Sequence, residues 1–510
     1  MEKFAEKIDK SLLKTVLCSA AVWGLLAHGM AMFNKYSFHD DTTSFNGVGA
    51  TYESGRWMLG ILGDLSAKLA GSKNYSLPVV NSAITILCIA VIVYLLASSL
   101  KIHSKLLTIL LCGSMVTFPS VTGTFSYMFT APYYYFASLL GVMGAWIFFR
   151  KKNLWSLFVC TVLMACSVGV YQANIPVCIC TLLLYMLEDI RQFDMDWKSF
   201  WKIALSNAAI CIGFIVEYFL INQYFLHKLD IVLSDYQGIN NFGKTSLSNY
   251  IYRILCGYGS FFYPSTAVED FSARYVYALL IVIAAIIAVF TLRKMRILKT
   301  PKAWQTILVL IAYPIAACFV YLMVDPWNVY TLMTFGQAFA FALIVWLIDK
   351  YPENGTKVEC AFCKTAAALL GILAILNIRY SNICYLKADV MQTQMISYYT
   401  TLITRIESTE GYTENTPVVY IGEDNKHDKN LVGISKYFDD LDLPTYKESF
   451  IFNDYAWKEN MELWCGFSPE LGDAAEFAGN AEVASMPCYP DQGSIRCIDG
   501  KIVVKFADEQ

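Results

Sequence analysis

The chain is organised as long apolar stretches separated by short polar ones. A helix that crosses a lipid bilayer needs about 20 predominantly apolar residues. By this criterion the sequence predicts about eleven spans, near 12–33, 78–99, 105–122, 132–149, 154–171, 173–188, 203–226, 273–291, 304–324, 329–348 and 362–379. The pattern therefore predicts an all-α polytopic membrane domain over residues 1–380.

Two features of this span pattern bear on the later argument. The first apolar run is longer than the core of a signal peptide, which has about 7–15 residues, and no small-residue cleavage pattern follows it. It is predicted to remain as an uncleaved first span. The fifth and sixth spans are separated only by Tyr171-Gln172-Ala173-Asn174, which predicts a tight hairpin.

Lysine and arginine recur in every second loop. The basic segments include Lys3, Lys7, Lys10 and Lys14, Lys101 and Lys105, Arg150 to Lys152, Arg191, Lys198 and Lys202, Arg293 to Lys302, and Lys350, Lys357 and Lys364. Because cytoplasmic loops carry an excess of these residues, we expect a cytoplasmic N-terminus and an extracytoplasmic C-terminus. The outer side then carries the loop 34–76, an aromatic stretch at 120–135, the loop 227–273 and the tail.

The tail, residues 381–510, is expected to form a small extracytoplasmic α/β domain. Val418 to Ile421 predicts a short buried strand, and the apolar residues on both sides of Asp499-Gly500 predict a hairpin. Cys488 and Cys497 flank a turn containing Pro490 and Gly493, so a disulfide between them is one hypothesis. Two reduced cysteines in a small core are the other.

Composition supports a lipid environment and excludes some partners. Hydrophobic residues make up 56% of the 510 and charged residues 16%, against about 25% charged in soluble domains, and mean hydropathy is +0.45. The net charge of −3 argues against nucleic acid. Most of the 16 cysteines lie in apolar runs, where they behave as small hydrophobes. Cys360-x-x-Cys363 lacks a second pair, so no metal site is predicted, and a need for a divalent cation stays open.

Paired carboxylates follow the first span. Phe38-His39-Asp40-Asp41 is followed by Gly55-Arg56-Trp57. A charge near hydrocarbon is costly unless it is solvated or paired, and a carboxylate can act as a general base. Arg56 is the nearest counter-ion or phosphate ligand. His39 could orient a carboxylate or help to bind a divalent ion, or it could simply be a polar residue at the interface. The alternative is that both aspartates cap a helix or are solvated in a loop.

An amphipathic interfacial helix is predicted directly after Arg56. Its apolar residues fall on one helical face, with the small residues Gly63, Ser66 and Ala67 behind. That apolar face comprises Trp57, Met58, Ile61, Leu62, Leu65 and Leu69.

This arrangement resembles the type C glycosyltransferases, which take sugars from polyprenyl-phosphate carriers. Asp40-Asp41 with Gly55-Arg56-Trp57 is similar to the serotype-converting O-antigen glucosyltransferase family, and Gly169-Val170-Tyr171-Gln172 resembles that family's Tyr-Gln motif. The resemblance covers roughly residues 10–380 and does not include the tail.

The resemblance implies a multi-pass enzyme of a bacterial plasma membrane. It would move a sugar, commonly glucose, from undecaprenyl phosphate onto an extracytoplasmic envelope polysaccharide, with Asp40 and Asp41 as candidate catalytic residues. The candidate donor-phosphate and substrate-binding residues are Arg56, His39, Trp57, Tyr171, Gln172 and Glu217. Glu217 enters because it is the clearest charge within a span, although packing against a neighbouring span would also explain it.

Other functions fit parts of the pattern. A transporter or lipid flippase would show several paired charges at mid-membrane and two related halves, neither of which is evident. A non-catalytic envelope assembly factor and a polysaccharide polymerase or ligase stay open. The sequence does not decide the sugar, the acceptor polymer, metal dependence or the stereochemistry at the anomeric carbon.

Overall fold

The computed structural model describes residues 9–193, 195–234, 245–262, 273–294, 300–350, 355–422 and 456–508. The chain divides into two compact units: Met1–Lys35 with Asn46–Ile383, and Tyr36–Phe45 with Cys384–Gln510. The sequence-based boundary was 380/381, with all of loop 34–76 assigned to the membrane domain. The structure instead groups the first part of this loop, including both aspartates, with the C-terminal residues.

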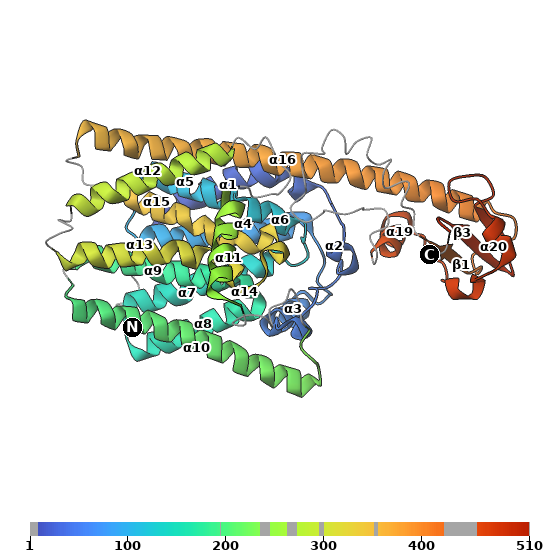
Figure 1. Ribbon diagram of the computed structural model, residues 1–510, viewed down its shortest axis with the longest axis horizontal. Helices are drawn as coiled ribbons and strands as arrows, with labels where there is room; N and C mark the ends of the chain where they lie inside the picture. Colours follow the sequence, from blue (N-terminus) through green and yellow to red (C-terminus); the bar gives the residue numbers. More distant parts are fainter. Residues whose placement is uncertain are drawn as a thin grey trace. The chain divides into compact units, whose positions relative to one another are not determined.

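The first unit is a helical bundle (Figure 1). Helix starts are marked by caps and prolines: Asp9 caps the first helix, and Pro78, Pro119 and Pro301 each stand in the first turn of one. Its helices are α1 (Lys10–Phe33), α3 (Trp57–Ala70), α4 (Pro78–Ser99), α5 (Lys105–Val116), α6 (Pro119–Phe125), α7 (Ala131–Lys151), α8 (Leu154–Val170), α9 (Ile175–Gln192), α10 (Trp197–Leu229), α11 (Leu247–Phe262), α12 (Ala273–Lys294), α13 (Pro301–Ala317), α14 (Val320–Met323), α15 (Phe339–Asp349) and the first part of α16 (Lys357–Glu407). Short 3₁₀ turns are η2 (Tyr52–Ser54), η3 (Gln172–Asn174), η5 (Pro326–Asn328) and η6 (Thr331–Ala338).

The predicted number of spans is not confirmed. Among the described residues, eight helices are long and apolar enough to cross a membrane, or nine if α5 and α6 form one span bent by 42°. Pro119 ends the α5 ladder because its ring cannot continue a helix. Two predicted spans, 154–171 and 304–324, fall on α8 and α13, which have 17 residues each.

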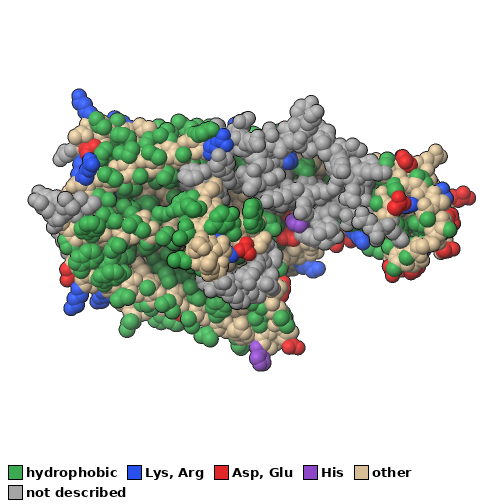
Figure 2. All heavy atoms as spheres, in the orientation of Figure 1, with side chains coloured by type: hydrophobic (Ala, Val, Ile, Leu, Met, Phe, Trp, Pro, Cys, Tyr) green, Lys and Arg blue, Asp and Glu red, His purple; other side chains and the backbone are tan. Residues whose placement is uncertain are grey.

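The surface of the bundle is that of a membrane protein. Large apolar side chains are exposed along its sides, among them Leu205, Ile212, Leu220, Val282, Ile311 and Ile375. Figure 2 shows hydrophobic side chains spread over the sides of the helices, with Lys and Arg near the end where α13 and α16 begin. Apolar patches of this extent are rare on soluble monomers.

Several of the basic loops meet at that end of the bundle. Glu188 is fully buried there and accepts hydrogen bonds from Arg191, Gln192 and the Trp346 indole. The contacts that join the loops are Lys101 to Gln192 at 3.2 Å, Lys152 to Asp189 at 2.5 Å, Lys302 to the Arg191 carbonyl at 2.9 Å, Lys294 to Glu359 at 3.3 Å, and Lys350 to the Lys101 carbonyl. Which side of the membrane this end faces stays a prediction.

The second unit contains α2 (Asp40–Thr43), the distal part of α16 and a small sheet. Strands β1 (Val418–Ile421), β2 (Ile495–Ile498) and β3 (Lys501–Lys505) have the order β1-β3-β2, with β1 parallel and β2 antiparallel to β3. Asp499 and Gly500 have φ of 50° and 76°, as a two-residue hairpin turn requires. The predicted strand and hairpin are confirmed. Helices α19 (Trp457–Cys465) and α20 (Ala481–Ser485) and the turn η7 (Ala474–Phe477) complete the unit.

The second unit resumes at Cys384, close to the predicted start of the tail, but no loop marks this boundary, because α16 continues through it to Glu407 as a helix of 51 residues. Its distal part buries residues at helical spacing, including Met395, Tyr399, Leu402 and Ile406, so packing within the unit sustains it. Cys488 and Cys497 are free thiols, which agrees with the second of the two hypotheses for this pair.

Candidate functional site

Gly55 organises the first half of the candidate site. Its φ of +71° is in the left-handed region that favours glycine. A Cβ at this position would lie 2.6 Å from the Tyr218 hydroxyl and 3.0 Å from the Gln172 amide nitrogen. Tyr218 donates to the Gly55 carbonyl at 3.1 Å, and Gln172 donates to the Ser54 carbonyl at 2.8 Å and to the Tyr218 hydroxyl at 3.1 Å. The turn before Arg56 is thus fastened to α10 and to the α8–α9 hairpin.

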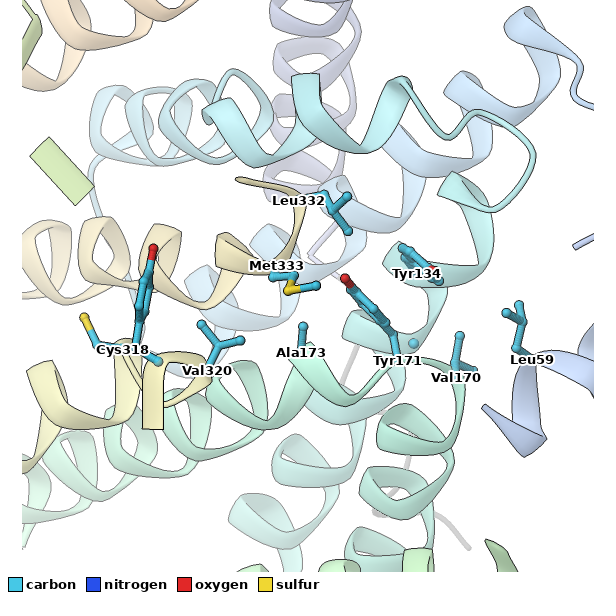
Figure 3. Packing of buried hydrophobic residues seen from close by; sticks show 11 residues of the cluster. Leu59, Tyr134, Val170, Tyr171, Ala173, Cys318, Val320, Leu332 and Met333 are labelled. Carbon is cyan, nitrogen blue, oxygen red and sulfur yellow. The ribbon is translucent and has the colours of Figure 1, made fainter. Parts of the chain in front are cut away.

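Arg56 and Tyr171 form the second half. The guanidinium carbon lies 5.3 Å from the Tyr171 ring centroid, within cation–π distance. Tyr171 stacks on Tyr134 with centroids 4.1 Å apart and planes 2° from parallel. Figure 3 shows the two rings side by side, with Met333 next to Tyr171. Because α8 begins just after Lys152 at the basic end of the bundle, its last turn brings Tyr171 to the opposite end.

These residues border a cavity of about 160 Å³, well above the roughly 10–15 Å³ that one water needs. Its polar lining comes from Ser54, Arg56, Gln172, Tyr218, Asn222 and Ser234, and its apolar lining includes Val320, Met323 and Met333. Asn222 is 2% exposed, and its Oδ1 has no hydrogen-bond partner among the described residues. A buried acceptor without a partner costs free energy, so a ligand with a donor group would be favoured here.

Trp57 packs beneath the cavity and does not line it. Its indole is 3% exposed and stacks on Phe225 with centroids 6.2 Å apart. Gly169 makes room for it, because a Cβ there would lie 2.5 Å from the indole. In α3 the small residues Gly60 and Gly63 are buried against the protein, whereas Leu65 and Leu69 are 50% and 80% exposed. Leu65 and Leu69 of the predicted apolar face are therefore available to lipid, whereas Trp57 is buried and Met58 and Leu62 pack against the core.

The paired aspartates lie in the second unit. Asp40 and Asp41 form the first turn of α2, preceded by His39 with φ of 55°. Asp41 is fully buried and accepts a hydrogen bond of 2.6 Å from the Ser37 hydroxyl. Asp40 and His39 are half-buried. Of the two carboxylates, Asp40 is thus the more accessible to a reacting group.

Comparison with known families identifies the chain. The profile of the family described as "Glucosyl transferase GtrII" matches residues 29–341. The protein belongs to this family. Neither a comparison with curated proteins nor one with solved structures found a match.

Membership in the glucosyl transferase family makes the chain a membrane glucosyltransferase. The matched region contains every candidate site residue, from His39 to Glu217, and ends within α15. Helix α16 and the C-terminal α/β residues lie outside it.

Glu217 of this glucosyltransferase is not part of the cavity. Its Oε1 accepts a hydrogen bond of 2.7 Å from Thr161 of α8. Its neighbour Tyr218 lines the cavity instead, because successive residues on a helix point about 100° apart. In the part of the chain that the structure describes, no group of three or more His, Cys, Asp or Glu side chains could hold a metal ion.

Sequence reasoning missed four of the six polar lining residues of the cavity: Ser54, Tyr218, Asn222 and Ser234. Tyr218 and Asn222 stand four positions apart on α10 and therefore on one face. The available signal was a polar residue one turn beyond an aromatic one within an apolar span, and it is weaker than the charge of the adjacent Glu217.

Proposed function

We propose that this glucosyltransferase moves glucose from an undecaprenyl-phosphate carrier onto an extracytoplasmic envelope polysaccharide such as O-antigen. The observation that carries the proposal is the small polar cavity beside Arg56, located at the end of the bundle opposite the basic loops. It offers a guanidinium, amide groups and tyrosine rings, which suit a phosphate joined to a sugar.

Arg56 is proposed to hold the donor phosphate. When the bond between the anomeric carbon and the phosphate oxygen breaks, the electron pair stays on the phosphate, whose growing charge a fixed cation stabilises. The Tyr171 ring, backed by Tyr134, restricts the guanidinium to one side. Asn222 and Gln172 supply polar groups for sugar hydroxyls at the same cavity.

Asp40 is proposed as the general base. The acceptor hydroxyl attacks the anomeric carbon, and its proton passes to the Asp40 carboxylate as the new glycosidic bond forms. Asp40 is preferred to Asp41 because Asp41 is fully buried and bonded to Ser37. Asp41 would then hold the turn in shape, and His39, half-buried beside Asp40, would orient it.

The proposed membrane topology puts the acceptor on the same side as the candidate site. If the basic end of the bundle faces the cytoplasm, the loop that follows α1 lies outside, where a polysaccharide acceptor is available. The C-terminal residues would lie on the same side.

The test uses purified protein in lipid nanodiscs with undecaprenyl-phosphate-linked radioactive glucose and extracted polysaccharide. We expect label to appear in the polymer, and Asp40→Asn to reduce its rate by about 10²–10⁴-fold. Asp64→Asn, which changes an exposed carboxylate of α3, is the matched control and should retain parental activity. A parallel assay in sealed proteoliposomes covers the flippase alternative: movement of the lipid-linked sugar across the vesicle membrane, with no transfer to polymer, would contradict the proposal.

A further inference from the structure

The turn that carries the paired aspartates is too short to be stable alone. Helix α2 has four residues, and isolated helices shorter than about 12–15 residues are marginal in water. Yet Phe38, Asp41 and Thr42 are 2%, 0% and 6% exposed. A well-defined buried turn of this length needs a tertiary partner.

Within the second unit, that partner is α19. The Thr42 hydroxyl donates a hydrogen bond of 2.9 Å to Oδ1 of Asn460, and Asn460 is 1% exposed. Helices α2 and α19 pack against each other (Figure 1). Buried hydrogen bonds between side chains fix geometry, because an unmatched buried partner is costly.

Helix α19 is in turn fixed to the C-terminal sheet. Trp457, in its first turn, meets the Tyr420 ring of β1 edge to face, with centroids 4.8 Å apart. Tyr420 stacks on Phe506, directly after β3, with centroids 6.1 Å apart. A continuous line of packed side chains therefore leads from the sheet through α19 to Thr42, the residue after Asp41.

We propose that α19 is a positioning element for the carboxylate turn, with Asn460 as its positioning residue acting through Thr42. The C-terminal part of the second unit, Cys384–Gln510 (the C-terminal module), would hold the orientation of Asp40 during transfer, although it lies outside the region shared with the glucosyl transferase family. This inference rests on the proposed role of Asp40.

The experiment compares Thr42→Val, Thr42→Ser and Asn460→Ala in the full-length protein in nanodiscs. Thr42→Val removes the donor with little change in shape, and Thr42→Ser keeps the hydroxyl. We expect kcat to fall about tenfold in Thr42→Val and Asn460→Ala, KM for the lipid-linked donor to be unchanged, and Thr42→Ser to stay near the parental rate. The double variant Thr42→Val/Asn460→Ala should be no worse than either single variant, as expected for one shared interaction.

Val483→Ala is the control for loss of module stability. Val483 is buried in the core beside the sheet, in a cluster with Val419 and Val503, and no member of that cluster belongs to α2 or α19. We expect this variant to lower the melting temperature without the selective fall in kcat. The same kinetic change in Val483→Ala would overturn the positioning role.

The outcomes separate this inference from the proposed function. If Asp40→Asn is inactive while Thr42→Val and Asn460→Ala retain parental kcat, the positioning role is wrong and the proposed function stands. If Asp40→Asn is itself active, the general-base role of Asp40 and the positioning role both fall, whereas glucose transfer to the polymer by the parental protein stands. Should Asn460→Ala fail to accumulate, the contrast between Thr42→Val and Thr42→Ser still decides the question.

Discussion

A side chain of any size at residue 55 would meet two groups of the cavity at once. Gly55→Ala combines a strained φ with a Cβ 2.6 Å from the Tyr218 hydroxyl, and left-handed strain alone costs about 1–3 kcal/mol. We expect transfer by Gly55→Ala to fall at least about tenfold, since tenfold corresponds to roughly 1.4 kcal/mol. Initial rates at saturating donor provide the measurement.

Gly71 offers the matched control for this prediction. It has a similar φ of +68°, but a Cβ there would have nothing within 4 Å. Gly71→Ala should therefore have a lower melting temperature, because of the backbone strain, and should keep its transfer activity. Equal loss of activity in both variants would mean that strain alone, and not the cavity, explains the effect.

Arg56 provides the second prediction at the residue scale. A guanidinium can bind phosphate through two parallel hydrogen bonds, whereas an ammonium is a point charge, and hydrogen bonds to charged groups contribute about 1.5–3 kcal/mol. We expect Arg56→Lys to lower kcat/KM for the donor by about 10–100-fold and Arg56→Ala to lower it further. Rates measured against donor concentration check this. A stable Arg56→Ala protein with parental donor dependence would contradict the phosphate role.

The packing of α3 on α8 is the critical contact at the scale of elements. Gly169 lies in the last turn of α8, and a Cβ there would lie 2.5 Å from the Trp57 indole. Gly169→Ala should displace the start of α3, and with it Arg56, at a cost of about 1–3 kcal/mol for overpacking. We expect a lower melting temperature together with reduced transfer.

Gly371 in α16 is the control at this scale. A Cβ there would make an ordinary contact of 3.5 Å with Leu110. Alanine is favoured over glycine within a helix by about 1 kcal/mol, so Gly371→Ala should be neutral or stabilising and fully active. A destabilised Gly371→Ala would show that the bundle tolerates no added methyl group. The effect of Gly169→Ala could then not be attributed to the contact with Trp57.

For the whole molecule, orientation in the membrane is the decisive property. Ser485 in the C-terminal module and Lys151 at the basic end of the bundle are both exposed. We expect Ser485→Cys to gain label over the parent from a membrane-impermeant maleimide in intact cells, and Lys151→Cys to gain label only after permeabilisation. The reverse result would place Asp40 in the cytoplasm and end the proposal of an extracytoplasmic acceptor.

Local features of the chain were predictable from the sequence alone. Each apolar run predicted as a span contains a helix, because lipid leaves no other partner for backbone groups. The hairpin turn at Asp499-Gly500 was predictable because a two-residue turn needs positive φ at both positions, which Asp-Gly adopts readily. The motif Gly55-Arg56-Trp57 singled out Arg56, which lines the polar cavity in the structure, but the catalytic or binding role of Arg56 stays a prediction. The same motif indicated the glucosyl transferase family that the profile match then showed.

Contacts between distant segments were decided only by the tertiary structure. Tyr218 reaches the Gly55 carbonyl across 163 positions, and Thr42 reaches Asn460 across 418. The spacing of apolar and polar residues along the chain does not reveal such pairs, because they depend on how each helix is rotated about its axis and on where its neighbours lie. The rotation of α10 about its axis also turns Glu217 away from the cavity that Tyr218 lines. Asp41 is fully buried, whereas the adjacent Asp40 is half-buried, so the two carboxylates differ in access. The sequence determined which residue types were present and which helices they formed, and packing determined which of those residues share a site.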